Sequence, residues 1–359
     1  MKKVAIVSTV GLMYDGITSV ILSYLEAMDR TDLDIYVIAT IKKEESIVGR
    51  LQSIGCNIVN LPSRKSTPLR YLKALTSFLK SNKIDIIHAH GNSSTLSIEM
   101  MAGLIAGCKK RIAHSHNTTC NHIVFNNILF PIFTCSYTDA LACGEEAGKW
   151  MFRNRPFTVL KNGRDVDKYK FNKQKRLSMR KELNIDNNFV VGHVGGFNHQ
   201  KNHEFLIEIF REILKIKPNS ILVLIGDGPL KTEIERKALD IKSSIMYIGT
   251  VDNVQDYLHA MDVMILPSLY EGLPLVAIEW QINGLPCLLS DSITKDCAFS
   301  NNVKFLSLNK SYKEWAESVI NLSNIYDRQL SSEESSNIIS EEGFNIKKCA
   351  EILLDIYLK

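Results

Sequence analysis

The segment from Asp262 to Gln281 places a buried strand, a turn and a helix in direct succession. The apolar run Asp262-Val-Met-Ile-Leu-Pro is typical of a parallel strand that is covered on both faces. Helical spacing follows, with Pro274 expected at the first helical position and Glu279 expected about two turns further on. A helix that begins at the carboxyl end of a parallel strand points its free N–H groups into the crevice where open α/β sheets bind ligands.

The turn between strand and helix predicts an anion site flanked by two acids. The free N–H groups of Leu273 and Leu275, together with the helix dipole, suit a diphosphate. Glu271 before the helix and Glu279 within it are carboxylates that accept hydrogen bonds from paired hydroxyls. We therefore expect one acid to hold a sugar and the other a ribose. Taken singly, each acid is better explained as a helix N-terminal or solvated carboxylate, and only the whole pattern favours the functional interpretation.

The whole pattern Pro-Ser-x-x-Glu-Gly-x-x-Leu-Val-x-x-Glu, from Pro267 to Glu279, resembles the donor-site motif of family 4 glycosyltransferases. These are retaining enzymes of the GT-B fold. The segments Glu-Gly-Leu-Pro-Leu and Gln281-Ile-Asn-Gly-Leu-Pro are most similar to those of bacterial capsule and exopolysaccharide transferases. The resemblance covers essentially the whole chain. It implies an α/β protein of two Rossmann-like domains whose parallel sheets face each other across a cleft.

Chain length and composition fit that organisation. A chain of 359 residues exceeds the size at which a single core stops growing, and its 45% apolar and 23% charged residues are ordinary for a globular protein. We expect an acceptor-binding domain over residues 1–163 and a donor-binding domain over residues 164–340. The polar segment 166–185 is expected to be a linker. The resemblance implies that a final helix, residues 341–359, packs back on the first domain.

Nothing in the sequence predicts export or a membrane span. No apolar run approaches the roughly 20 residues that a span needs, and the first eight residues are too short and strand-like for a signal peptide. The eight cysteines are scattered without a C-x-x-C pair, as is common in the reducing cytosol. We therefore expect a cytoplasmic protein.

Charge is spread unevenly along the chain. Residues 1–160 carry 18 Lys and Arg against 12 Asp and Glu, whereas the remainder carries 25 against 27. The basic half predicts either a peripheral contact with an anionic membrane or simply a mildly basic solvated surface. No motif for stacking on bases or reading a groove is present, so nucleic acid is not expected as a partner.

The first domain offers candidates for the acceptor side. A Gly-containing turn after the strand Val4–Ser8 leads into a helix from Ile17. The resemblance places Gly16 and Ile17 of this loop at the acceptor, within reach of the donor phosphates. It also implies that His116 is the crevice histidine near the sugar and acceptor, with His114 as the competing candidate.

Two histidine pairs, His88-Ala-His90 and His114-Ser-His116, lie at the carboxyl ends of predicted strands. The His-x-His spacing suggests a metal. Alternating residues of an extended chain are expected to point to opposite faces, and no carboxylate or cysteine completes a ligand set. We therefore expect no metal site, and no cofactor beyond the substrate nucleoside diphosphate sugar.

The apolar and aromatic stretch from Asn121 to Phe133 carries no charge. It allows two interpretations: an interfacial patch that touches a lipid acceptor, or a buried core helix. The core helix is the simpler one and is favoured. Pro131 is expected to interrupt it.

A second phosphate-binding device is expected where the strand from Phe189 runs into Gly195-Gly196 and then Lys201. It resembles the family's Gly-Arg-x-x-x-x-Lys-Asn element, in which Lys201 matches but Gly196 replaces the arginine. Three alternatives follow: Arg164 or another basic residue supplies the missing charge, the phosphate depends more on the helix amides, or the site is weakened. The resemblance extends donor binding to Gly195, Gly196, Lys201, Gly226, Gly249, Glu271, Gly272, Leu273, Pro274, Leu275 and Glu279.

The sequence thus predicts a metal-independent, hexosyltransferase-type glycosyltransferase. The family relationship implies retaining transfer from a nucleoside diphosphate sugar, with UDP favoured, to a saccharide or lipid-linked acceptor. Glu271, Lys201 and His116 are the expected catalytic residues. A sugar-nucleotide epimerase on the same fold, or a catalytically weakened binding protein, are the alternatives. Sugar, linkage and oligomeric state are not predicted.

Overall fold

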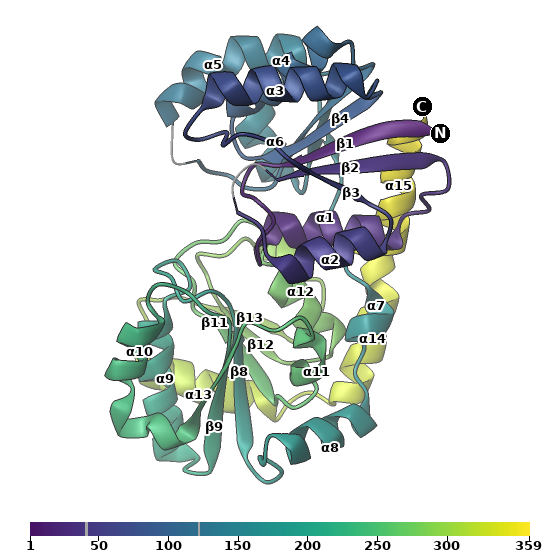
Figure 1. The fold of residues 1–359 in the computed structure, drawn as a ribbon. Coiled ribbons are helices and arrows are strands. Elements are labelled where there is room, and N and C mark those ends of the chain that lie inside the picture. Colours follow the sequence, from purple (N-terminus) through teal and green to yellow (C-terminus); the bar gives the residue numbers. More distant parts are fainter. Residues whose placement is uncertain (40–41, 121–122) are drawn as a thin grey trace. The chain divides into compact units, whose positions relative to one another are not determined.

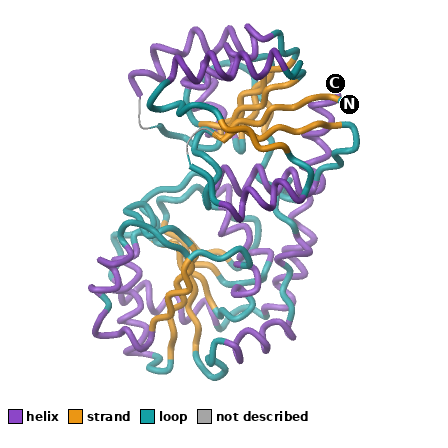
Figure 2. Tube along the Cα trace, viewed as in Figure 1, coloured by secondary structure: helices purple, strands orange, loops and turns teal. Residues whose placement is uncertain are grey.

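The computed structural model describes residues 1–39, 42–120 and 123–359. The chain divides into two compact units, Met1–Gly163 with Gly343–Lys359, and Arg164–Glu342. Each unit is a parallel sheet with helices on both faces (Figures 1 and 2). The predicted α/β class with two parallel sheets is confirmed. Within the described ranges, no helix has both the length and the apolar character that crossing a bilayer requires.

The first unit contains a seven-stranded parallel sheet of order β3-β2-β1-β4-β5-β6-β7. Its strands are β1 Lys2–Ser8, β2 Leu33–Ala39, β3 Asn57–Asn60, β4 Ile86–Gly91, β5 Lys110–Ser115, β6 Asp139–Ala142 and β7 Thr158–Val159. Its helices are α1 Gly16–Ala27, α2 Glu45–Ser53, α3 Pro68–Ser81, the 3₁₀ helix η1 Ser94–Leu96, α4 Ser97–Ala106, α5 Ile123–Ser136, α6 Glu145–Phe152 and α15 Ile346–Leu358.

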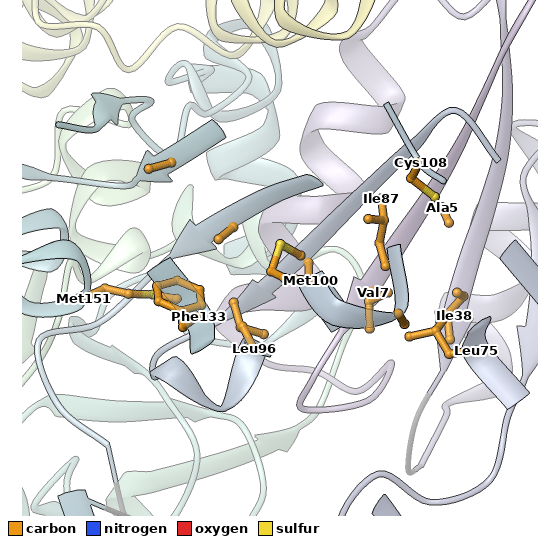
Figure 3. Close-up of a cluster of buried hydrophobic side chains, with 14 of the residues drawn as sticks. Ala5, Val7, Ile38, Leu75, Ile87, Leu96, Met100, Cys108, Phe133 and Met151 are labelled. Atoms are coloured by element: carbon orange, nitrogen blue, oxygen red, sulfur yellow. The ribbon is translucent and has the colours of Figure 1, made fainter. Parts of the chain in front are cut away.

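The core of the first unit follows the period-two pattern of its strands. Ala5 and Val7 of β1 and Ile87 of β4 point to the same face, where Leu75 of α3 and Met100 of α4 cover them (Figure 3). All five are completely buried. The residues that alternate with Ile87 and Ala89 along β4 are His88 and His90, which therefore belong to the opposite face.

Helix α15 belongs to the first unit, although it is the last element of the chain. It begins after Asn345, whose side chain accepts a hydrogen bond from the Lys347 N–H. The helix packs against α1 (Figure 1). Lys2 Nζ donates to the Tyr357 carbonyl at 2.9 Å, so the two ends of the chain are joined. Its buried residues are Ile346, Cys349, Ala350, Leu353 and Tyr357.

The second unit contains a six-stranded parallel sheet of order β10-β9-β8-β11-β12-β13. Its strands are β8 Phe189–Val194, β9 Ser220–Ile225, β10 Ile245–Gly249, β11 Val263–Leu266, β12 Cys287–Ser290 and β13 Val303–Leu306. Its helices are α7 Val166–Tyr169, α8 Lys173–Glu182, α9 His203–Ile216, α10 Lys231–Lys237, η2 Leu239–Ser244, α11 Val254–Leu258, α12 Leu275–Ile282, η3 Lys295–Cys297, α13 Tyr312–Ser323 and α14 Arg328–Glu341.

Two hydrophobic clusters cover the two faces of this second sheet. Val191 and Ile265 face a cluster built with α9 and α13, whereas their strand neighbours Val190 and Met264 face one built with α12. Because both faces are covered, these strands are apolar at nearly every position, with the buried His193 of β8 as the polar exception. This explains why they are visible in the sequence as continuous apolar runs.

Segment 166–185 was predicted to be a linker, and that prediction is wrong. It forms α7 and α8, and α8 is anchored to the residues before β11 by two arginines. Arg176 Nη1 donates to the Met261 carbonyl at 2.7 Å, and Arg180 Nη1 donates to the Ala260 carbonyl at 2.7 Å. Both arginines also pair with Asp262. A segment that is polar in composition is thus part of the packed second unit.

Helix α5 departs from two predictions. It continues through Pro131 instead of ending there, and it is not a core helix. Phe133 is buried, but Val124 and Ile128 are 64% and 63% exposed. The exposed apolar residues of α5 and the end of α4, which we call the apolar patch, are Leu104, Ile105, Ile123, Val124, Phe125, Ile128 and Ile132. Asn121 and His122, which open the predicted stretch, lie outside the described residues.

Gly284 and Gly249 form a matched pair for testing backbone strain in the second unit. Both have a positive φ, +70° and +81°. A Cβ at Gly284 would lie 2.7 Å from the Ser332 nitrogen and would overlap the Arg328 carbonyl, whereas a Cβ at Gly249 meets nothing within 4 Å. We predict that Gly249→Ala costs about 1–2 kcal/mol, the left-handed penalty alone. Gly284→Ala should cost clearly more, because α14 must shift.

Calorimetric melting of the two variants checks this prediction. The melting temperature of Gly284→Ala should fall below that of Gly249→Ala. Equal melting temperatures would show that α14 does not pack on the turn after α12.

Candidate functional site

The order of strands in the second sheet reverses between β8 and β11. From β8 the chain continues to β9 and β10 on one side, and β11 to β13 lie on the other side. The carboxyl ends of β8 and β11 are therefore neighbours, and the loops that leave them diverge. Open α/β sheets bind their ligands at this kind of reversal. The loop after β8, residues 195–202, and the loop after β11, residues 267–274, contain most of the predicted donor residues.

The two loops are tied together by hydrogen bonds. The Leu269 N–H donates to the Gln200 carbonyl at 2.9 Å, and Asn202 Nδ2 donates to the Pro267 carbonyl at 3.2 Å. Asn202 has a φ of 54°, in the left-handed region that asparagine tolerates. These contacts fix the position of Lys201 between the two bonded residues.

Lys201 and Glu271 form an ion pair at the centre of these loops. Lys201 Nζ lies 2.6 Å from Glu271 Oε1, with side-chain exposures of 15% and 8%. Gln200 Nε2 donates to the other carboxylate oxygen at 2.9 Å. The Lys201 N–H is held by Asn198 Oδ1 at 3.1 Å. Both charged groups are thus held in position within the protein before any ligand binds.

Helix α12 begins directly after this pair. Pro274 is its N-cap residue and not its first helical residue, so that prediction is shifted by one position. Since the helix starts at Leu275, Glu279 is its fifth residue and lies about one turn in, not two. The first N–H groups of the helix, at Leu275 and Val276, have no intrahelical acceptor and carry the positive end of the dipole.

The predicted glycines converge beside the loop after β8. The Gly195 N–H donates to the Ile225 carbonyl at 2.9 Å, and the Gly226 N–H donates to the Gly249 carbonyl at 2.8 Å. Gly226 has a φ of +137°, and a Cβ there would overlap the Gly195 carbonyl. The ends of β8, β9 and β10 therefore approach each other closely, which only glycine allows.

Gly196 differs from these glycines because its surroundings do not require it. A Cβ at this position would lie 3.4 Å from the Asp227 carbonyl oxygen, an ordinary contact, and the glycine has no positive φ. Packing therefore does not explain why glycine stands where the family pattern has arginine.

Arg164 was considered as a replacement for that arginine, but its Nε donates to Glu279 Oε1 at 2.8 Å. The side chains of Arg164 and Glu279 are 2% and 9% exposed. The second predicted acid is therefore a member of a buried ion pair within the second unit.

The acceptor-side candidates lie in the first unit. Gly16 is the first residue of α1, and the side chain of the N-cap residue Asp15 accepts from the Thr18 N–H at 3.0 Å. Ile17 is 7% exposed and contributes to the core. The His116 N–H donates to Asn92 Oδ1 at 3.1 Å.

Four histidines of the first unit, His88, His90, His114 and His116, form a stacked column. Neighbouring ring centroids are 4.2 Å apart for His88 and His90, and 4.2 Å for His114 and His116. The expectation that each pair is divided between two faces was wrong, because residues two apart on a strand share a face. In the register of the sheet, His90 pairs with His114.

Hydrogen bonds run through this column. His88 Nδ1 lies 2.6 Å from the Tyr357 hydroxyl, and His88 Nε2 lies 3.2 Å from His114 Nδ1. His90 Nδ1 lies 2.8 Å from His116 Nε2. Of the two competing candidates, His114 is completely buried whereas His116 is partly exposed. His116 is therefore the more exposed of the two candidates.

The column is held in the neutral state. Burial lowers the pKa of His88, His90 and His114 well below the ordinary value, and it lowers the pKa of His116 to about 3. His88, His90 and His114 each have a ring nitrogen within 4.8 Å of the other two, so a metal set is geometrically conceivable. In each of these rings, however, a nitrogen already bonds to another histidine or to Tyr357. That no metal binds here stays a prediction.

Comparison with known proteins identifies the family. The model of the family described as Glycosyl transferases group 1 matches residues 188–324. A Bacillus subtilis (strain 168) protein named as a glycosyltransferase, EpsF, is 30% identical over 330 residues, which cover 86% of this chain and 85% of that protein. The chain belongs to the group 1 glycosyl transferases.

Two further proteins extend the comparison over the full length. The UDP-Gal:alpha-D-GlcNAc-diphosphoundecaprenol alpha-1,3-galactosyltransferase of Escherichia coli is 26% identical over 378 residues, covering 99% of this chain and 96% of that enzyme. The structure of Anabaena Alr3699/HepE in complex with UDP and glucose superposes with a TM-score of 0.82 at 16% identity, covering 99% of both chains. The structural similarity to the Anabaena protein shows the GT-B fold. The family 4 resemblance seen in the sequence is also confirmed.

Two residues of this glycosyltransferase's site, Gln200 and His193, were missed by sequence reasoning, and a third, Arg164, was named for a different role. Gln200 bonds Glu271, and its position next to Lys201 was the available signal. Arg164 was assigned to the wrong partner. His193 donates through Nδ1 to the Ile265 carbonyl at 2.8 Å, which leaves its buried Nε2 as an acceptor. Burial lowers the pKa of His193 to about 4, and this neutral ring lies next to Gly195 and Lys201.

The histidine column predicts a specific acid sensitivity. Because the folded protein lowers the histidine pKa values, the unfolded chain binds protons that the folded chain rejects. The stabilisation is therefore complete above about pH 6.5 and declines as the pH falls, by roughly 1.4 kcal/mol per pH unit for each buried neutral histidine. Urea titrations at pH 7.5 and 5.5 measure the change in the free energy of unfolding.

Replacing one histidine of the column isolates its contribution to the pH-dependent change in the free energy of unfolding. His90→Gln should reduce the loss between the two pH values by about 1.4 kcal/mol, the contribution of one proton. An identical pH dependence in the variant and the natural protein would contradict the neutral column.

Proposed function

We propose that this protein is a retaining glycosyltransferase that moves a hexosyl group from a UDP-sugar to a saccharide or lipid-linked saccharide acceptor. The observation that carries the proposal is the Lys201–Glu271 pair, held at 2.6 Å between the carboxyl ends of β8 and β11 and followed directly by the N-terminus of α12. A cation, a row of free amides and two carboxylates within one loop system match the parts of a sugar nucleotide.

Each group has a role in binding the donor. Lys201 and the first amides of α12 would stabilise the diphosphate, Glu271 would accept hydrogen bonds from sugar hydroxyls, and Glu279 would accept from the ribose. The loop after β8 would bring Gly195 and Gly226 close to the nucleotide. In this proposal the charge of the diphosphate is met by these groups, without a divalent metal.

The reaction breaks the bond between the anomeric carbon and the diphosphate oxygen and forms a bond from that carbon to an acceptor hydroxyl oxygen. The hydroxyl proton passes to the departing diphosphate oxygen on the same face of the sugar, which retains the anomeric configuration. Negative charge grows on the diphosphate during this step. Preorganised donors stabilise such charge by about 3–4 kcal/mol each, because they need no reorganisation.

The choice of UDP and of a polysaccharide pathway rests on relatives. The E. coli relative is named for a UDP-galactose donor and a diphosphoundecaprenol-linked acceptor, and the Anabaena protein binds UDP. By extension, we propose a role in capsule or exopolysaccharide assembly. His116 is the proposed acceptor-side residue, since it is the histidine of the column that is partly exposed.

Exchanging Lys201 or Glu271 tests the donor site. We predict that Lys201→Ala and Glu271→Gln each lower kcat/KM for sugar transfer by about 10²–10³-fold, because each removes a preorganised group from the growing charge or from the sugar. Transfer from UDP-sugars to a lipid-linked saccharide is measured by chromatography of the product. Lys215→Ala is the control, since its exposed ion pair with Glu212 lies on the last turn of α9.

The reaction products also distinguish a glycosyltransferase from the two alternative functions, an epimerase and a non-catalytic binding protein. An epimerase would convert the nucleotide sugar without an acceptor, and a binding protein would bind it without turnover. Transfer that is undiminished in folded Lys201→Ala and Glu271→Gln variants would overturn the proposed roles of these two side chains.

We further propose that the apolar patch touches the lipid surface from which a lipid-linked acceptor is presented. Helix α5 carries no charge, while the exposed Arg153 and Arg155 flank it. The Arg153 guanidinium lies 3.8 Å from the centre of the Phe130 ring. Apolar side chains beside cations suit an anionic bilayer interface.

Vesicle binding tests this contact. We predict that Val124→Ser with Ile128→Ser lowers sedimentation with phosphatidylglycerol vesicles at least several-fold, because two apolar side chains no longer enter the interface. Leu69→Ser with Ile352→Ser is the matched control, since these residues are 80% and 50% exposed but lie on α3 and α15. Equal loss in both double variants would contradict the assignment to α5.

A further inference from the structure

Arg164 occupies an unusual place for an arginine. It is the first residue of the second unit, follows the Asn162-Gly163 turn, and has a side chain that is only 2% exposed. Its Nε donates to Glu279 Oε1 at 2.8 Å. The pair joins two residues that are 115 positions apart in the sequence.

Burying both charges has a cost that must be offset. Removing a carboxylate and a guanidinium from water is unfavourable unless they meet in good geometry, so such pairs are not retained for stability alone. The planar guanidinium fixes the direction of a carboxylate more strictly than a lysine does. Arg164 thus restricts the orientation of the Glu279 carboxylate on the first turns of α12.

The contact uses one carboxylate oxygen. Among the described residues, Oε1 of Glu279 is bonded to Arg164, and no hydrogen bond within that part of the chain engages Oε2. A carboxylate held by one oxygen presents the other in a fixed direction, ready to accept from a hydroxyl. Because this carboxylate is already ordered, less conformational entropy is lost when a ligand binds to it than when a ligand binds to a freely rotating glutamate.

We propose that Arg164 is a positioning residue that aims Glu279 Oε2 at a ribose hydroxyl of the nucleotide. This inference rests on the proposed function, because it takes Glu279 as the ribose ligand. In this inference Arg164 acts through Glu279 and does not contact the diphosphate, which fits a side chain that is only 2% exposed.

Binding of UDP and its deoxy analogues tests the inference. Isothermal titration calorimetry measures the dissociation constants of UDP, 2′-deoxy-UDP and 3′-deoxy-UDP. The dissociation constant of each deoxy analogue is divided by that of UDP, and the larger of the two ratios is called the hydroxyl preference. We expect a preference of roughly 10–100-fold in the natural protein, the range for a hydrogen bond to a charged group. Glu279→Gln should reduce it to a few-fold.

Arg164→Met removes the donor while keeping a side chain of similar length. We expect it to lose the hydroxyl preference as Glu279→Gln does, and Arg164→Lys to regain part of it. A merely structural arginine would weaken UDP and the deoxy analogues by the same factor and leave the preference intact. That result, with Glu279→Gln still losing the preference, would overturn the role of Arg164 alone.

The double variant Arg164→Met/Glu279→Gln keeps the test decisive if Arg164→Met does not fold, because it leaves no unpaired buried charge. We expect it to bind UDP and the deoxy analogues as Glu279→Gln does, since Arg164 acts only through the carboxylate. A further loss of UDP affinity in the double variant would show a direct contact of Arg164 with the nucleotide and overturn the inference. If Glu279→Gln keeps the full preference, or the natural protein binds no UDP, the proposed donor site fails and the inference fails with it.

Discussion

The reversal of strand order between β8 and β11 is the constraint on which the proposed donor site depends. Two strands that are 72 positions apart at Val191 and Val263 become neighbours, and their following loops leave the sheet side by side. The Leu269–Gln200 and Asn202–Pro267 hydrogen bonds then lock one loop to the other. Without this juxtaposition Lys201 and Glu271 would have no reason to meet. The ion pair is therefore a product of topology first and of side-chain chemistry second.

The sequence predicts elements well where burial and boundary signals coincide. Strand β11 lies within the expected apolar run from Asp262 to Pro267, β8 begins at Phe189 as expected, and α1 begins within one residue of Ile17, because each is an apolar pattern with clear polar or turn residues at its ends. Strands β6 and β13 were missed, because each of these short strands contains a charged residue, Asp139 or Lys304, and so forms no continuous apolar run.

Amino-acid composition gives the wrong prediction for segments whose charged residues are buried or whose apolar residues are exposed. The charged composition of α8 is typical of a solvated linker, yet its residues Arg176 and Arg180 donate to backbone carbonyls inside the second unit. Conversely, α5 looks like a core helix, yet Val124 and Ile128 are exposed. A count of residue types cannot show which carbonyls need a donor or which face of a helix has no neighbour.

Within the site, the sequence identifies the residues but not their partners. Glu271, Lys201 and the converging glycines were expected near one another, because each follows a strand of the same sheet. That Glu279 bonds Arg164, and that Gln200 bonds Glu271, could not be predicted. Such choices depend on side-chain directions across more than 70 residues of chain, which no local pattern encodes.

The charges of the site suggest how an anion is bound when an expected arginine is absent. Lys201 is paired with Glu271, and Arg164 with Glu279, so these four side chains sum to zero. Position 196 would accept a Cβ atom without a clash but holds glycine. In the proposed function, these four side chains leave the first amides of α12 and the helix dipole as the main source of positive potential for the diphosphate, supported by a lysine whose charge is already shared. An anion held in this way depends on the exact placement of the backbone, which is why the hydrogen bonds that lock the two loops matter as much as the charged groups between them.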